Sequence, residues 1–307
     1  MMNPVMRRET RTTLRNWKLF IVIAVYVALL TLIAGFYTWN EVYYSYRGGF
    51  SPYSMMTLYV LMTVFELGLV LLTVPALTAG SISGERERQT LDLMLVTKMS
   101  PFAIVSGKLM SCLSAIFLII LASVPAFAVV FYFGGVSFVA LLSTTGFFLT
   151  VCCMVGAFSI FVSTVIKKTS LSMVVVYLFV GLLCLGTLIL CAIIQAAHWS
   201  NYNTAAPAWA SFVCLWPNPV VGLVSIIEEQ IGIAAMDDLI NMFYYVDNSV
   251  RNLNLYWILN VVGNLGLTAV FLALAAWRIQ PVKPGKGRKP KANKKEKPSH
   301  GRNRKTA

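Results

Sequence analysis

The feature that most constrains this chain is a run from Leu109 to Ile166 that contains no Asp, Glu, Lys or Arg. An uncharged apolar segment of about 18 residues or more has the usual length of a helix that crosses a membrane. The run is too long for one crossing, and Gly134-Gly135 near its middle supplies a turn, so it predicts a hairpin of two helices. The whole chain is 58% hydrophobic and 12% charged, whereas a soluble domain is roughly 25% charged. We interpret it as an all-α membrane protein.

The same pattern predicts six spans, at about 18–38, 56–79, 108–133, 137–164, 170–195 and 254–277. An even number of spans places both termini on one side. Basic residues gather in alternate connections, which the positive-inside rule assigns to the cytoplasm. These residues are Arg7, Arg8, Arg11, Arg15, Lys18, Arg86, Arg88, Lys98, Lys108, Lys167, Lys168 and Arg278. We therefore expect a multi-pass protein of the cell membrane with cytoplasmic N and C termini, and a first span that is an uncleaved signal-anchor.

Most of the excess positive charge lies in the last segment, residues 278–307. This tail holds twelve Lys or Arg against Glu296 alone, so it carries eleven of the net +13 charges. Its Pro, Gly and Lys content and its lack of apolar periodicity predict a disordered cytoplasmic tail beside anionic membrane lipid. Docking to a protein is the alternative, and nucleic acid is not an expected partner. Residues 1–277 are predicted to form one six-span membrane domain.

The sequence offers little for catalysis or metal binding. Cysteines 112, 152, 153, 184 and 191 fall in predicted spans without a CxxC spacing, which is typical of small packing residues. The pair Cys152 and Gly156 is also compatible with a close helix contact. There is no HExxH or G-x-S-x-G motif, and the Gly107-Lys108 pair lacks the other residues of a phosphate loop. We expect no catalytic, metal-binding or cofactor-binding residue in this chain.

The charges that remain are concentrated in the stretch GERERQTLDLML, residues 84–95, within the longest connection on the basic side. We predict an amphipathic helix there, capped by Ser83 or Gly84, with acidic residues in its first turn. Its apolar side contains Leu91, Leu93, Met94 and Leu95, and its charged side forms a surface for a cytoplasmic partner. A solvated helix with local salt bridges is the simpler alternative.

The order of these features in residues 75–109 resembles the signature of type-2 ATP-binding-cassette (ABC-2 type) permeases, the membrane subunits of ABC exporters. In that family a Glu-Arg pair, a Thr-Leu-acidic-Leu run, a Ser-Pro-like turn and a Gly-Lys pair follow one another. Here these are Glu85-Arg86, Thr90-Leu91-Asp92-Leu93, Ser100-Pro101 and Gly107-Lys108. Two positions depart, with Gln89 where many members have Gly and Lys98 where many have Pro. Residues 3–18 also resemble the amphipathic helix that precedes the first span in this family.

The resemblance implies a separate ABC ATPase subunit that binds ATP and Mg and hydrolyses the nucleotide, so this chain itself is not an enzyme. It also implies a second permease, in a homodimer or heterodimer that forms the translocation pathway. The segment 84–95 would then be the coupling helix. Its candidate docking residues are Glu85, Arg86, Glu87, Arg88, Gln89, Thr90 and Asp92. An ATP-independent channel or transporter is the alternative function, and drugs, lipids, peptides and ions are all compatible substrates.

Two further features of the membrane domain invite an interpretation. Glu66 is the one acid inside a predicted span; it either lines the pathway or is held by Ser, Thr or Tyr hydroxyls as an inter-helix contact. The outer segment 196–253 contains an amphipathic helix, predicted from Asn218 as cap and Pro219 in the first turn. We expect that helix at the outer surface or dipping partly into the bilayer, as an exit lid or as a cap over the bundle.

Overall fold

The computed structural model describes residues 17–44, 52–90, 100–132, 136–202, 213–231 and 256–279. Over these residues the chain is helical and contains no strand. Six of its helices, counting the fifth span as one, are long and apolar enough to cross a membrane. The prediction of an all-α chain with six spans is therefore confirmed. The elements are α2 (Trp17–Tyr44), α3 (Pro52–Thr78), α4 (Ser83–Glu87), α6 (Pro101–Tyr132), α7 (Phe138–Val165), α8 (Thr169–Gly181), η1 (Leu182–Gly186), α9 (Thr187–Tyr202), α11 (Pro219–Ile231) and α14 (Tyr256–Arg278).

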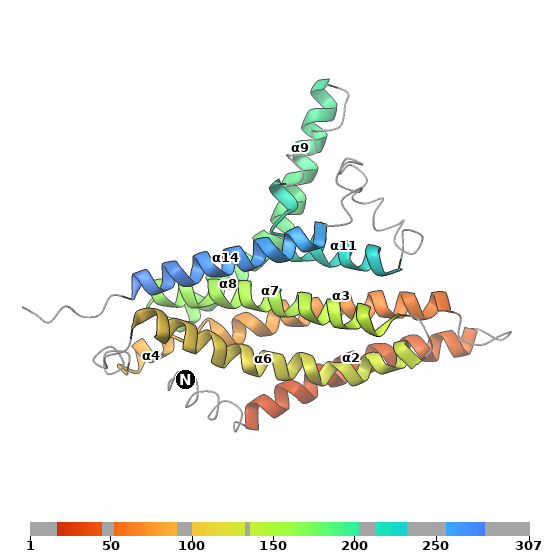
Figure 1. Ribbon diagram of the computed structural model, residues 1–307, viewed down its shortest axis with the longest axis horizontal. Helices are drawn as coiled ribbons and strands as arrows, with labels where there is room; N and C mark the ends of the chain where they lie inside the picture. The colour runs from red at the N-terminus through yellow and green to blue at the C-terminus, as the bar shows by residue number, and fades with distance from the viewer. Residues whose placement is uncertain are drawn as a thin grey trace, which may run out of the picture.

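The spanning helices lie side by side in one bundle (Figure 1). The short helix α4 lies at one end of it, which we call the α4 end. The first residues of α2, α6 and α8 and the last residues of α7 and α14 lie at the same end (Figure 1). Three predicted features fall outside the described residues: the helix preceding the first span, the turn at Gly134-Gly135, and the tail after residue 279.

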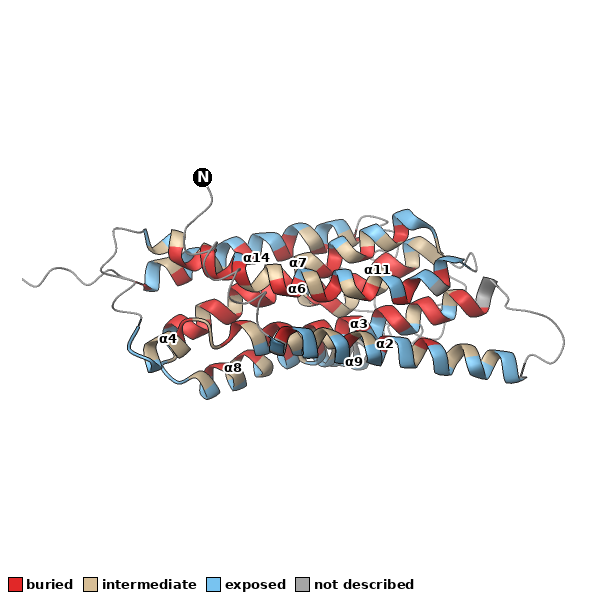
Figure 2. Cartoon of the chain, turned by 90° about the horizontal axis from the view of Figure 1, so that it is seen from below, coloured by how far each residue is buried: buried red, intermediate tan, exposed pale blue. Residues whose placement is uncertain are grey.

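Helix α7 forms the centre of the bundle and packs against α3, α6, α8, α11 and α14. Its buried side includes Phe147, Val151 and Cys152, and the faces that the helices turn outward are exposed (Figure 2). Gly156 marks a close contact with α6, because a Cβ atom added there would lie 3.1 Å from Leu109 Cδ1. Small residues that allow such approach are typical of helix contacts in membranes. The outward-facing apolar side chains suit contact with lipid.

The fifth span, predicted at about 170–195, is present but is not a regular α-helix throughout. It is divided into α8, the π-helix η1 and α9, and α9 leaves the bundle at a steep angle (Figure 1). Asn218 makes hydrogen bonds at this break. Its Nδ2 donates to Cys184 O (2.9 Å) and to Thr187 Oγ1 (2.7 Å). Side chains that take a main-chain carbonyl out of the helical ladder are a common cause of such breaks.

Helix α11 begins at Pro219, and Asn218 Oδ1 accepts the N–H of Val220 at 2.8 Å, which is the geometry of a helix cap. The helix is built into the bundle, because Gly222, Leu223, Ile226 and Ile227 are buried and it packs on α3, α7, α14 and η1. Its last turn is held by Gln230, which bonds to Tyr59 of α3 and to Ala140, Ser143 and Thr144 of α7. Polar groups at both ends therefore fix this helix against the spans.

Candidate functional site

The charged connection at the α4 end starts with α4 itself, which begins at Ser83. Its N-cap residue is Ile82 and no side chain of the connection caps it, so the prediction that Ser83 or Gly84 caps the helix is wrong. The backbone N–H groups of Ile82 and Ser83 instead donate to Ser163 Oγ of α7, at 3.0 and 2.8 Å. All three residues are buried. The first N–H groups of α4 are thus satisfied by a neighbouring span, which fixes α4 to α7.

The helix predicted over 84–95 is also not continuous, because α4 ends at Glu87. Arg88, Gln89 and Thr90 form a turn in which Gln89 has φ of 58° and Thr90 N–H donates to Glu85 O at 2.9 Å. A left-handed residue ends a helix because it redirects the backbone out of the helical path. The predicted docking residue Asp92 and the apolar side Leu91–Leu95 lie outside the described residues.

Glu85 forms an ion pair with Lys108 of α6, with 2.6 Å between Lys108 Nζ and Glu85 Oε1. The two side chains are only 20% and 6% exposed, so the pair is largely removed from water. Removing one partner of a buried pair leaves an uncompensated charge and is strongly destabilising. Glu85 Oε2 is buried and accepts no hydrogen bond from the described residues. Glu85 therefore joins α4 to α6 and keeps one acceptor unused.

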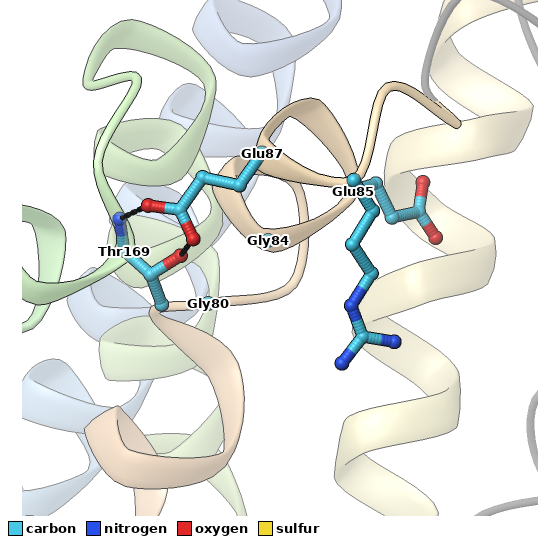
Figure 3. A pocket seen from close by; sticks show the side chains of 6 residues that line it. Gly80, Gly84, Glu85, Glu87 and Thr169 are labelled. Atoms are coloured by element: carbon cyan, nitrogen blue, oxygen red, sulfur yellow. Dashed lines mark hydrogen bonds between the residues drawn. The ribbon is translucent and has the colours of Figure 1, made fainter.

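Glu87 binds the start of α8. The backbone N–H of Thr169 donates to Glu87 Oε1 at 2.8 Å, and the Thr169 hydroxyl donates to Glu87 Oε2 at 2.7 Å (Figure 3). These bonds, the backbone one foremost, hold the pKa of the Glu87 carboxyl below its ordinary value. A lowered folded-state pKa means that the contact is lost only as the pH falls through that lowered value. At neutral pH Glu87 is a carboxylate at the positive end of a helix.

Around these two carboxylates lies an open pocket of about 390 Å³, lined by Gly80, Gly84, Glu85, Glu87, Arg88 and Thr169 (Figure 3). Arg88, Gln89 and Thr90 are exposed beside it, and Arg86 is half-buried. Neither arginine forms a salt bridge with the described residues. Of the predicted docking residues, the structure therefore uses Glu85 and Glu87 inside the chain and presents the other described ones at the surface.

Glu66 lies within the bundle, away from this end, and is 3% exposed. Its Oε1 accepts a hydrogen bond of 2.5 Å from Ser123 Oγ of α6. Ser123 also donates to Ile120 O in its own helix. This geometry corresponds to the second interpretation of Glu66, an inter-helix contact held by a hydroxyl.

Three residues of the site were not identified from the sequence as partners: Lys108, Ser163 and Thr169. Lys108 stood out as a basic residue near a span end, which is equally explained by topology, and as part of the Gly107-Lys108 signature pair, neither of which pointed to Glu85 as its partner. Ser and Thr are frequent inside these spans, and most of them bond to a carbonyl of their own helix, as Thr78 does to Val74 O. Nothing in the sequence therefore singled out Ser163 and Thr169, because their hydrogen-bond partners lie about 80 residues away in the chain.

The comparison with known families places this geometry in context. The family model described as ABC-2 family transporter protein matches residues 3–280, which is nearly the whole chain. No curated protein matches the chain. The matched region includes every spanning helix, α4 and its partners on α6, α7 and α8.

Proposed function

The chain belongs to the ABC-2 family of transporter proteins, and from this premise we propose that it is the permease of an ATP-driven exporter, docked to its ATPase through α4 and the turn that follows. Family membership makes it a membrane subunit of an ABC transporter that is not itself the ATPase. The export direction, the pairing with a second permease and the docking site are the parts that we propose. We place both termini and the α4 end in the cytoplasm of a cell-membrane protein, because the basic residues of the connections gather there.

The observation that carries the docking proposal is the position of the charged residues. Arg88, Gln89 and Thr90 are exposed immediately after α4, whose start is fixed to the bundle. Arg86 and Arg88 have no acidic partner among the described residues. A partner surface with carboxylates would pair with both arginines. Rim charges of this kind contribute mainly to partner choice and association rate.

The fixed start of α4 explains how a docked ATPase could act on the membrane part. ATP-driven closure of two ATPases would displace two α4 helices, one in each permease. Because α4 is joined to α6 by Lys108 and to α7 by Ser163, it cannot move without those spans. Rigid helices carry a displacement at one end over their whole length. ATP and Mg act on the ATPase, and this chain supplies the moving spans.

The test is purification of the tagged chain from its native membrane in mild detergent, with the co-purified proteins identified by mass spectrometry. We expect a Walker-type ATPase with the wild-type chain, and loss of most of it with Arg86→Glu and Arg88→Glu. Arg278→Glu is the matched control, because Arg278 is an exposed arginine at the same end of the bundle but lies on α14. It should retain the ATPase.

Two outcomes would contradict the proposal. If the folded wild-type chain recovers no ATPase, and the purified chain alone carries ionic currents in bilayers, the ATP-independent channel becomes the better function. If Arg278→Glu loses the ATPase as fully as Arg86→Glu and Arg88→Glu, binding depends on overall charge at this end, and α4 is not the docking element.

A further inference from the structure

The start of α8 is capped from another helix. Its own N-cap residue, Lys168, makes no side-chain cap bond. The cap comes from Glu87 of α4, whose carboxylate accepts both the backbone N–H and the hydroxyl of Thr169 (Figure 3). The approach needs Gly80, because a Cβ atom at that position would lie 2.9 Å from Thr169 Cγ2. A glycine, a carboxylate and a helix start therefore form one contact between α4 and the fifth span.

This contact differs from the other two attachments of α4. The bonds to Ser163 of α7 join buried groups, and the ion pair with Lys108 of α6 is largely buried. The Glu87 carboxylate is exposed to water, so its contact with Thr169 can be removed by substitution without leaving an unpaired charge buried. Helix α4 is therefore fixed to α6 and α7 by buried groups and is joined to α8 by a contact at the exposed surface.

The contact between Glu87 and Thr169 reaches the fifth span, which is the irregular one. From Thr169 the chain runs through α8 into the π-helix η1, after which α9 turns away from the bundle (Figure 1). Farther along α8, Ser172 Oγ donates to Ala79 O and Tyr177 Oη donates to Leu72 O, both at 2.8 Å. These bonds join α8 to α3 and its following turn, whereas the hydrogen bonds that join α8 to α4 itself among the described residues are those of Thr169 to Glu87.

We propose that the Glu87–Thr169 contact is the positioning link that passes a displacement of α4 to the fifth span. This inference rests on the proposed function, since it assigns the route from the docked ATPase to α8, η1 and α9. Glu87 and Thr169 touch neither nucleotide nor substrate in this scheme. They act by tying the position of α8 to that of α4, while the attachments to α6 and α7 persist.

The most selective variant is Thr169→Pro, because it removes both donors at once. Thr169 is the first residue of α8, where proline is well tolerated, and the preceding Lys168 is already extended, with φ of −98° and ψ of 127°. Thr169→Ser keeps both donors and should behave as the wild type. Tyr177→Phe is the matched control, since it removes a bond between α8 and α3 without touching α4.

The readout is hydrogen exchange of the purified permease–ATPase complex in lipid nanodiscs, with and without ATP, Mg and vanadate. We expect the wild type, Thr169→Ser and Tyr177→Phe to show nucleotide-dependent changes in α6, α7, α8 and α9. Thr169→Pro should retain the bound ATPase, the vanadate-sensitive hydrolysis and the changes in α6 and α7, and lose those in α8 and α9. Glu87→Ala should show the same loss in α8 and α9, and combining it with Thr169→Pro should add nothing.

The proposal is overturned if α8 and α9 respond to nucleotide in Thr169→Pro as they do in the wild type. It is also overturned if Tyr177→Phe loses the response equally, because any weakening of α8 packing would then suffice. Recovery of no ATPase with the wild-type chain would instead refute the proposed function, so the two failures are distinguishable.

Discussion

At the scale of single residues, the carboxylates at the α4 end have different tasks. Glu85 neutralises Lys108 in a largely buried pair, and Glu87 caps α8. Their arginine neighbours have no acidic partner in the described part of the chain. Sequence proximity therefore does not imply a shared role, since adjacent residues on a short helix point in different directions. Docking experiments on this segment should change the arginines first, because changing Glu85 also disturbs α6.

Gln89 is the one non-glycine residue with positive φ in the described chain, at 58°. A left-handed conformation costs a residue with a side chain about 1 kcal/mol, and glycine adopts it freely. We expect Gln89→Gly to raise the free energy of unfolding by up to about 1 kcal/mol, and the β-branched Gln89→Val to lower it. Thermal unfolding of the purified chain in detergent measures both. A lower midpoint for Gln89→Gly would mean that contacts of the Gln89 side chain outweigh the backbone strain.

Glu66 supports a second test at this scale. Its carboxylate accepts from Ser123 between α3 and α6, and Glu66→Ala would leave a cavity and remove that acceptor. We expect Glu66→Ala to lower the free energy of unfolding by about 1–3 kcal/mol, whereas Glu66→Gln keeps an acceptor oxygen and should stay close to the wild type. Detergent unfolding and the ATPase activity of the complex are the measurements. Normal folding of Glu66→Gln with lost activity would favour the pathway interpretation.

At the scale of elements, hydrogen bonds hold the start of α11 against α14. Trp216 Nε1 donates to Leu259 O at 2.9 Å, and Asn260 Nδ2 donates to the carbonyls of Trp216 and Asn218. Asn264 in turn donates to Asn260 Oδ1. Buried amides with several partners favour one arrangement, because shifting the helices would break these bonds inside the membrane. The helix is thus held by hydrogen bonds at its start and by Gln230 at its end.

Gly222 of α11 tests this packing. A Cβ atom there would lie 2.6 Å from Asn260 Oδ1 and 2.9 Å from Phe147 Cε2, and Asn260 cannot retreat without losing its own bonds. We expect Gly222→Ala to destabilise the folded chain by about 1–3 kcal/mol, as overpacking usually does. Gly266→Ala on α14 is the control, because nothing lies within 4 Å of a Cβ atom there. Equal yields and midpoints for the two variants would show that α11 is loosely packed.

At the scale of the whole molecule, the bundle has two chemically different ends. The α4 end carries the starts of α2 and α8, the end of α14 and the connection with Arg86 and Arg88 (Figure 1). The basic tail of the sequence continues from α14 at this end. The predicted association of that tail with anionic lipid stays a prediction, and its sidedness can be tested directly.

Topology reporters provide that test. We expect green fluorescent protein fused after residue 279 to fluoresce in the cytoplasm, and alkaline phosphatase inserted between residues 232 and 250 to be active outside, because basic connections stay cytoplasmic. The exchanged fusions, phosphatase after residue 279 and fluorescent protein at 232–250, should be inactive. Activity of the exchanged pair would reverse the assignment and would place α4 where no ATP-driven partner could reach it.

The sequence by itself determined the class of the protein. Uncharged apolar runs of this length form helices in a membrane, because every backbone polar group there must be hydrogen-bonded within the protein. The six spans were therefore predictable from the sequence. The family resemblance was recognisable from the motifs in residues 75–109. Turns and helix interruptions were harder to predict from the sequence. The start of α4 at Ser83 and the π-helix η1 have hydrogen-bond partners, Ser163 and Asn218, that are distant in the chain.

The tertiary structure alone decided which charges are internal and which remain at the surface. A charge pattern predicts a polar face, but it does not say whether Glu85 meets Lys108 or whether Glu87 meets Thr169. The tertiary structure also decided that α11 packs among the spans and that the fifth span is divided into α8, η1 and α9. Local sequence sets backbone preference and amphipathicity, whereas a hydrogen bond between residues about 80 positions apart exists only once the helices have packed.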